Sequence, residues 1–368
     1  MSSLSALPDH EVARILIPEA EGTHLTGDAA KRRVSGNSGL LPFAVDPRRG
    51  RIYWGDIADH PLREWQYTYT MQYLSETGSI GECFTTDFDV LYDDGLITDG
   101  NAPDAFIYHI SRCGSTLIAK ALARVDRNIV INQGSPLQRG FWAQLTDSFR
   151  RPLEPTEDNL TAFRTIIRAM ARRRRESQSS AIVKFVSWNT LCIDFISQAF
   201  PQIPSLFMYR EPVEVIASVI QRPTPALVAK GNRLGDLIAG GAPEGPVGES
   251  DIQYLARCTA NYFRAALEAT DNENLKLVNY RAISPETFED ILNRGLDLHP
   301  SLPELETMKK QFRFHSKDDA NSTEFRSDGL QKASLITKQG KTDIATLCGD
   351  LLARLDRAPQ NLFDKGQN

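Results

Sequence analysis

The sequence predicts an α/β fold with a parallel sheet covered by helices on both faces. Two observations indicate this fold. First, five short β-rich runs follow one another: "AFIYHI" (105–110), "NIVIN" (128–132), "AIVKFV" (181–186), "SLFMYR" (205–210) and "LKLVNY" (275–280). Second, helical patterns lie between most of them, at 115–125, 157–175, 190–199, 212–220 and 251–270. Apolar strands that alternate with helices are typical of a buried parallel sheet.

The remaining segments are arranged around this region. Residues 1–100 are mixed in character, with one helix-like stretch, "PLREWQYTYTMQYLSE", and we interpret them as an N-terminal extension of a domain that spans 101–368. Residues 221–251 are rich in Gly and Pro, which predicts a long surface loop. This loop is a candidate lid, with a plain insertion as the alternative.

Composition excludes several classes of protein. The net charge of -5 over 368 residues argues against general nucleic-acid binding, so an anionic ligand needs a local cluster of Arg and Lys. The five cysteines are far apart and form no CxxC pair, which argues against a metal site or a disulfide framework. The sequence contains neither a secretory signal nor a membrane-spanning run. We therefore expect a cytoplasmic protein without nucleic-acid or membrane partners, and no oligomeric state is specified.

The stretch "FIYHISRCGSTLIAKAL" (106–122) predicts an anion cradle between a buried strand and a helix. The start of the helix offers free backbone N–H groups, Gly114 permits close approach, and Arg112 adds full charge. Ser115 and Thr116 add hydroxyl donors. The alternative is that Ser115 merely caps the helix. The Gly-Lys pair of an ATP-binding loop is missing, so phosphates would not be held in the ATPase manner.

A second candidate segment is "SLFMYREPVEVIASVIQRP" (205–223), in which a strand ends at Arg210 and a helix begins with Pro212. Arg210 lies at the carboxyl edge of a strand, where open parallel sheets bind ligands. Ser218 follows two turns into the helix. The alternative is that Arg210 only forms a salt bridge with Glu214.

Together these two segments resemble the PAPS-dependent sulfotransferases, whose donor is 3′-phosphoadenosine 5′-phosphosulfate (PAPS). The resemblance covers about residues 104 to 335 and implies a P-loop-like sulfotransferase fold with the N-terminal extension on the acceptor side. With Arg rather than Lys in the first loop, the sequence is more similar to the bacterial and carbohydrate-type branches of this family. By this resemblance, Lys184 at the end of "AIVKF" points toward the transferred group, and basic residues of a C-terminal loop close over the 3′-phosphate. The implied donor-binding residues are Arg112, Cys113, Gly114, Ser115, Thr116, Leu117, Arg210, Ser218, Tyr280, Arg326 and Lys332.

The resemblance implies an enzyme that transfers a sulfonate group to a hydroxyl or nitrogen of a small molecule, for example a natural product. The product nucleotide would be 3′-phosphoadenosine 5′-phosphate (PAP), and no metal is required. Arg112 and Lys184 suit the stabilisation of the leaving phosphate. Two alternatives stay open: a nucleotide-dependent phosphotransferase that uses the same cradle, and a catalytically silent relative that binds the donor.

The general base departs from the family pattern. Val186 and Gln133 occupy places where relatives carry a His or a carboxylate. His109, at the end of the cradle strand, is the nearest titratable alternative, although a structural His is an equally good interpretation. The other hypotheses are an acid from the first hundred residues, or a nitrogen acceptor that needs little deprotonation.

The run Arg172–Arg175 is a tempting phosphate patch. It ends a predicted helix, where cations favour the helix dipole and stay solvated, and we interpret it as a solvated surface run.

Overall fold

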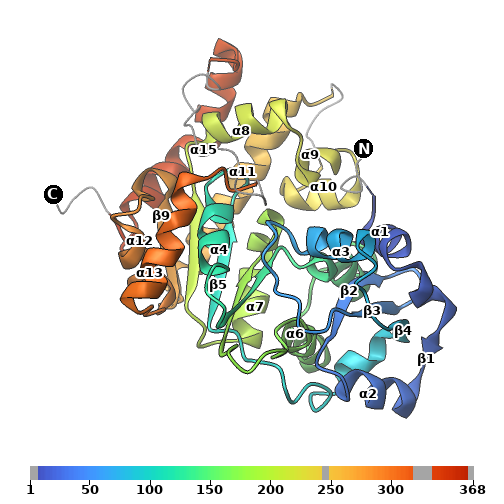
Figure 1. Cartoon of the computed structure of the whole chain (residues 1–368). Coiled ribbons are helices and arrows are strands. Elements are labelled where there is room, and N and C mark those ends of the chain that lie inside the picture. Colours follow the sequence, from blue (N-terminus) through green and yellow to red (C-terminus); the bar gives the residue numbers. More distant parts are fainter. Residues whose placement is uncertain (1–6, 243–247, 318–333, 364–368) are drawn as a thin grey trace.

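The parallel sheet predicted from the sequence is present in the computed structural model, which describes residues 7–242, 248–317 and 334–363 (Figure 1). Its five strands all run parallel in the order β6-β7-β5-β8-β9. The α/β fold class is therefore confirmed, and each predicted run contains one strand. The strands are β5 (Ala105–His109), β6 (Asn128–Asn132), β7 (Ser180–Lys184), β8 (Ser205–Tyr209) and β9 (Leu275–Asn279).

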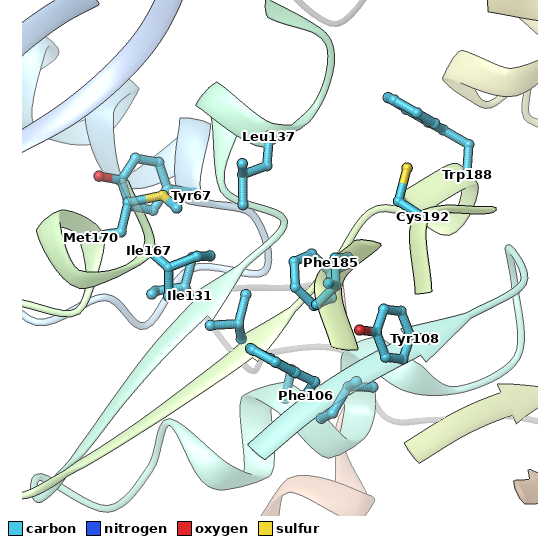
Figure 2. Close-up of a cluster of buried hydrophobic side chains, with 14 of the residues drawn as sticks. Tyr67, Phe106, Tyr108, Ile131, Leu137, Ile167, Met170, Phe185, Trp188 and Cys192 are labelled. Carbon is cyan, nitrogen blue, oxygen red and sulfur yellow. The ribbon is translucent and has the colours of Figure 1, made fainter. Parts of the chain in front are cut away.

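Both faces of this sheet are covered. Every residue of β5, β7 and β8 is buried, and because successive side chains of a strand point to opposite faces, neither face meets solvent there. Aromatic rings fill the core: Tyr108 stacks on Phe185 with ring centroids 5.1 Å apart, and Phe106 lies 5.2 Å from the same ring. Figure 2 shows these rings in one cluster with Tyr67, which comes from the N-terminal region.

The strand order creates a switch point at β5. The chain leaves β5 for β6 and β7 on one side of it, and then for β8 and β9 on the other side. The segments that follow β5 and β8 therefore diverge, and in open α/β sheets such a crevice at the carboxyl ends of the strands is where ligands bind.

Residues up to about 100 build a second sheet that the sequence analysis did not foresee. Its order is β1-β4-β3-β2, with β1 parallel to β4 and the other pairs antiparallel. Strand β2 is buried along its whole length and contacts α5 and α6 of the following region, so both sheets share one hydrophobic core. The elements are α1 (Asp9–Leu16), β1 (His24–Leu25), α2 (Gly27–Ser35), β2 (Leu40–Asp46), β3 (Arg51–Asp56), α3 (Tyr67–Glu76) and β4 (Cys83–Asp87).

The predicted helices are present with well-defined starts. Thr156 caps α6 by accepting the N–H of Asn159 at 3.3 Å, Pro212 opens α8, and Ser250 forms a capping box with Gln253 at the start of α11. No helix in the described ranges is both long and apolar enough to cross a bilayer. The helices outside the N-terminal region and the candidate lid are α4 (Ser115–Leu122), α5 (Gly140–Leu145), α6 (Glu157–Met170), α7 (Ile193–Ala199), α8 (Pro212–Gln221), α11 (Asp251–Glu268), α12 (Phe288–Asp290), α13 (Leu302–Lys309) and α15 (Lys338–Arg357).

The candidate lid at 221–251 is not a plain loop, which corrects the prediction. Its described part contains α9 (Pro225–Val228) and α10 (Arg233–Ile238). Asn232 caps α10 by accepting the N–H of Gly235 at 3.0 Å, and Tyr254 of α11 donates to the carbonyl of Ala226 at 2.8 Å. Gly and Pro suggested a loop, but Pro225 occupies the start of a helix, where its missing N–H costs nothing.

The run Arg172–Arg175 is not uniformly solvated, which corrects a second prediction. Helix α6 ends at Met170, and Arg172 is completely buried. Its guanidinium donates to the carbonyls of Val34 and Ser35 at 2.5 and 3.1 Å, and to Asp99 Oδ2 at 2.9 Å. Arg172 therefore ties the end of α2 to the segment after α6.

Candidate functional site

The loop between β5 and α4 has the geometry of an anion cradle. Arg112 and Gly114 both lie in the left-handed region, with φ of 62° and 84°, and this turn brings the start of α4 to the sheet edge. Gly114 is the N-cap residue and no side chain caps the helix, so the interpretation of Ser115 as a simple cap is wrong. The first N–H groups of α4 therefore keep their capacity to bind an acceptor. Ser115 and Thr116 are both buried in this first turn.

Tyr280 and Arg210 lie against this loop. A Cβ at position 114 would lie 2.9 Å from Tyr280 Cδ2, so Gly114 is required by the close approach of the ring as well as by its φ. The Arg210 guanidinium lies 4.1 Å from the centroid of the Tyr280 ring, a cation–π contact. Arg210 Nη1 also donates to the carbonyl of Arg112 at 3.2 Å. Residues predicted from three separate segments thus meet at the carboxyl ends of β5 and β8.

The salt bridge that the sequence left open as an alternative is also formed. Arg210 contacts Glu214 Oε2 through Nη2 at 2.5 Å and through Nε at 2.6 Å. An anion approaching Arg210 would therefore meet a carboxylate already in place. Ser218 lies one helical turn beyond Glu214 and is buried.

The side chain of Arg112 reaches toward the end of α8. Its Nη2 donates to the carbonyl of Arg222 at 2.7 Å, whereas its Nε is buried without a hydrogen-bond partner. Burial, and secondly the charge of Arg222, lower the pKa of Arg112. A buried N–H that lacks an acceptor is costly and is a candidate contact for a ligand. The contribution of Arg222 was missed, because nothing in its local sequence indicates that it meets Arg112.

Lys184 stands at the other end of the cradle. It is completely buried at the end of β7, with Nζ 3.1 Å from Asn132 Oδ1 and 3.5 Å from Thr116 Oγ1. Burial lowers the pKa of Lys184 to about 7, and the positive charge of Lys317 acts in the same direction. Asn132 was also missed, although it could have been found: it is a polar residue at the carboxyl end of β6, where the rule for ligand sites applies.

The contacts of His109 favour its structural interpretation over a role as base. Nδ1 lies 2.7 Å from the carbonyl oxygen of Ile110, and Nε2 lies 2.9 Å from that of Phe185. Neither nitrogen is therefore turned toward the cradle. Burial, and secondly the charge of Lys184, lower the pKa of His109 to about 3.

Gln133, which stands where relatives carry an acid, contacts the N-terminal region. Gln66 Nε2 donates to its side-chain oxygen at 2.6 Å. Gln66 immediately precedes α3, so the N-terminal region reaches the edge of the parallel sheet next to Asn132 and Lys184.

The other predicted residues contribute less. The thiol of Cys113 points inward and donates to the carbonyl of Ile110 at 3.0 Å, so only the backbone of Cys113 can face a ligand. Leu117 is partly exposed on α4. Arg326 and Lys332 lie outside the described residues.

No model of a known protein family matches the sequence, and no curated protein matches it. The class of protein is therefore defined by fold and site alone: an α/β protein with a cluster of basic residues at the switch point of its parallel sheet. Within the described ranges, no group of three or more His, Cys, Asp or Glu side chains is arranged to hold a metal ion.

Proposed function

We propose that this protein is a PAPS-dependent sulfotransferase that acts on a small-molecule acceptor. One observation carries the proposal: the uncapped helix start after β5 is contacted by a buried lysine, Lys184, on one side and by an arginine stacked on a tyrosine, Arg210 on Tyr280, on the other. A donor with a phosphosulfate and a separate phosphate needs two anion sites of this kind.

At the Lys184 end, the residues would stabilise the leaving phosphate. Lys184, Thr116 and the first N–H groups of α4 are preorganised donors in a buried setting, where such donors contribute most to catalysis. The unpaired Nε of Arg112 would supply a further donor. The donor molecule supplies the activated sulfonate, and negative charge builds on the phosphate as that group is transferred.

At the other end, Arg210 and Ser218 would bind the 3′-phosphate, with Tyr280 beside the adenosine. The guanidinium of Arg210 is held in place by Tyr280 and by the carbonyl of Arg112, so little side-chain entropy would be lost on binding. The phosphotransferase alternative would need carboxylates at strand ends to hold magnesium. Instead, β6 ends at Asn132, β7 ends at Lys184, and Arg210 directly follows β8.

Calorimetric titration with PAP and with Mg-ATP tests the proposal. We expect PAP to bind with a Kd on the order of micromolar, and Mg-ATP to bind far more weakly. Arg210→Ala should weaken PAP binding by about 100-fold, since a charged contact to phosphate is lost. Arg164→Ala, which removes a surface arginine paired with Glu157, is the matched control and should leave PAP affinity unchanged. Preference for Mg-ATP, or binding of neither nucleotide, would refute the proposal.

A second prediction concerns Glu214. Its carboxylate forms a salt bridge with the guanidinium of Arg210 and would repel a bound phosphate. Glu214→Gln keeps the shape of the side chain and removes the charge, so PAP should bind roughly three- to tenfold more tightly, equivalent to about 1 kcal/mol. The same titration measures this, and weaker binding by the variant would show that Glu214 instead positions Arg210.

A further inference from the structure

A cavity lies between α1, α3 and the short 3-10 helix η4 (Ser135–Leu137). Its wall is mixed: apolar residues such as Val12, Leu16, Phe43 and Met71 line it together with polar residues such as Gln72 and Arg139. Pro225 of α9 also lines it, so the candidate lid contributes to its closure; Figure 1 shows α9 and α10 near α1 and α3. Its volume is about 60 Å³, smaller than the roughly 300–1,000 Å³ typical of ligand pockets, so it suits only a compact organic molecule.

The cavity wall is connected to Lys184 through glutamines. Gln66 and Gln138 both line it. Both also contact Gln133: Gln66 donates to its side-chain oxygen at 2.6 Å, and Gln138 to its backbone carbonyl at 3.1 Å. Gln133 follows Asn132, whose side chain accepts from Lys184. Two glutamines of the cavity wall are therefore linked to Lys184 through Gln133 and Asn132, which makes the cavity our candidate for the acceptor side.

One carboxylate faces this cavity. Asp9, the first residue of α1, is 9% exposed and lines the wall, and its Oδ2 is buried without a hydrogen-bond partner. Burial raises the pKa of Asp9 to about 7, while the guanidinium of Arg139 and the backbone N–H groups of Gly140 and Arg139 oppose the rise. A carboxylate with a pKa near neutrality is suited to general base catalysis.

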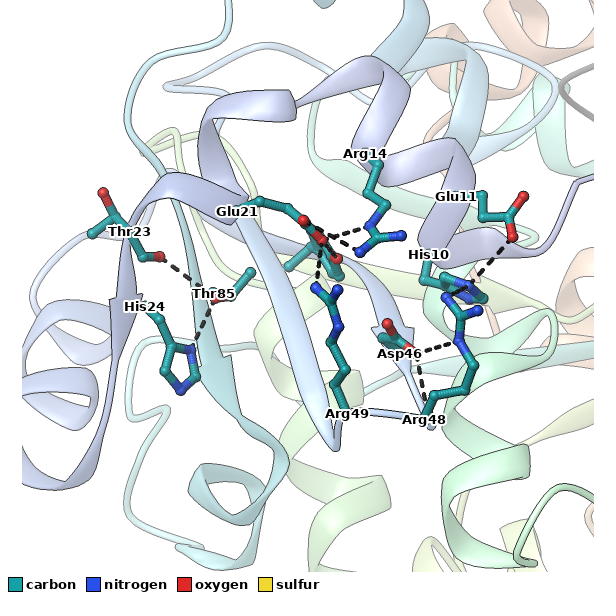
Figure 3. A network of polar contacts seen from close by, with 11 residues as sticks. His10, Glu11, Arg14, Glu21, Thr23, His24, Asp46, Arg48, Arg49 and Thr85 are labelled. Atoms are coloured by element: carbon teal, nitrogen blue, oxygen red, sulfur yellow. Dashed lines mark hydrogen bonds and ion pairs between the residues drawn. The ribbon is translucent and has the colours of Figure 1, made fainter.

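The rest of α1 is fixed by contacts with Glu21 and with the end of β2 and the loop after it, shown in Figure 3. Arg14 Nε donates to Glu21 Oε1 at 2.6 Å, and His10 contacts Arg48, which is bonded to Asp46. Because these contacts anchor the helix, Asp9 is held buried in the cavity wall rather than sampling solvent.

From this arrangement we infer that Asp9 is the catalytic base for a compact, largely apolar acceptor that carries a hydroxyl group and binds in the cavity. The inference rests on the proposed function. The acceptor oxygen forms a bond to sulfur as the bond from sulfur to the phosphate oxygen breaks. The phosphate oxygen leaves with the electron pair as part of PAP, and the hydroxyl proton passes to Asp9 Oδ2.

The pH dependence follows from the groups around Asp9. Arg139 faces it from the start of α5, Tyr69 and Gln66 line the cavity from α3 and the loop before it, and His10 and Glu11 are its neighbours on α1. The base form of Asp9 is populated above its pKa, so the rate of transfer should rise as the pH increases through about 7. Lys184 titrates in the same range, but a bound phosphosulfate would keep it protonated.

The experiment uses the full chain, PAPS, and the matched probes para-ethylphenol and para-ethylaniline, with sulfated product measured by mass spectrometry. Asp9→Asn keeps an oxygen that can accept the N–H groups of Arg139 and Gly140, so the fold should survive. We expect the wild type to transfer the sulfonate group to the phenol. In Asp9→Asn the rate of this transfer should be lower by on the order of 10²- to 10⁴-fold, and it should no longer rise through neutral pH. PAP affinity should be the same in both proteins. Glu11→Gln, on the outer side of the same helix, is the matched control and should transfer normally.

The other outcomes overturn the inference in distinguishable ways. Unchanged transfer by Asp9→Asn would exclude Asp9 as the base. Transfer to the aniline alone, or to neither probe by a protein that binds PAP, would overturn the assignment of the acceptor. Failure of the wild type to bind PAP would refute the proposed function itself.

Discussion

Replacing Lys184 by methionine is expected to abolish most of the proposed transfer activity and, at the same time, to stabilise the fold. Lys184 is completely buried, and burial lowers its pKa to about 7. At neutral pH the unfolded chain gains more from protonation of this lysine than the folded chain does. Methionine fills a similar volume without a charge, so the free energy of unfolding should rise by about 1–3 kcal/mol, after allowing for the lost hydrogen bond to Asn132.

The sign of the pH dependence makes this prediction specific. The folded pKa of Lys184 is about 7, below the unfolded value of roughly 10.4. Between these values the unfolded state binds more protons, so the stability of the wild type should rise with pH. The advantage of Lys184→Met should therefore be largest at and below neutral pH and should vanish near the unfolded pKa. Denaturant unfolding of both proteins across this pH range measures the difference.

Activity should move in the opposite direction. Loss of a preorganised cationic donor to the leaving phosphate typically lowers the rate by about 10²- to 10³-fold, and para-ethylphenol with PAPS provides the assay. Lys276→Met is a suitable control, since Lys276 lies on the edge strand β9 of the same sheet, with its Nζ hydrogen-bonded to the carbonyl of Glu273 at the surface. Destabilisation of Lys184→Met at neutral pH would contradict the account, because it would show that the buried charge is well compensated in the fold.

The parallel sheet could be predicted because its signal is local. Runs such as "AIVKFV" are apolar and short, and the rule that ligands bind at the carboxyl ends of parallel strands directed attention to Arg112, Lys184 and Arg210. The structure brings Arg112 and Arg210 into direct contact, and Lys184 reaches Thr116 in the same loop–helix segment. Pattern and topology are sufficient here, since each residue is fixed by the strand that precedes it.

The N-terminal sheet could not be predicted in the same way. Strand β2 is buried on both faces, so it lacks the alternation of a half-exposed strand, and its pairing with β3 is irregular between Pro42 and Ala44. Strand β1 has only two residues. Elements of this kind are defined by the partners that cover them, and those partners, α5 and α6, lie far along the chain.

The residues missed at the site share this long-range character. Arg222 meets Arg112 across 110 positions, and Gln66 meets Gln133 across 67. The raised pKa of Asp9 depends on burial beneath other segments and on the charge of Arg139. A pattern within one segment carries no information about such contacts. The candidate base was therefore left as an unspecified acid of the first hundred residues, although the cradle itself could be outlined.

Replacement of Arg172 tests whether the N-terminal region and the parallel sheet unfold as one unit. Arg172→Ala is expected to lower the free energy of unfolding by about 3–5 kcal/mol, because it removes a completely buried guanidinium and leaves its acceptors without partners. Two of those acceptors are the carbonyls of Val34 and Ser35 at the end of α2, and the third is Asp99. The loss should be seen by denaturant unfolding.

The number of unfolding transitions tells whether the two sheets unfold together. Because one hydrophobic core joins the two sheets, the variant should unfold in a single transition at lower denaturant, followed equally by fluorescence and by circular dichroism. Arg173→Ala is the control: Arg173 is exposed and bonds only to local carbonyls in the described structure, so its loss should change stability by less than about 0.5 kcal/mol. Two separate transitions in Arg172→Ala would show instead that residues 1–100 form an independently stable extension. In that case the cavity beside Gln66 could open without unfolding of the parallel sheet.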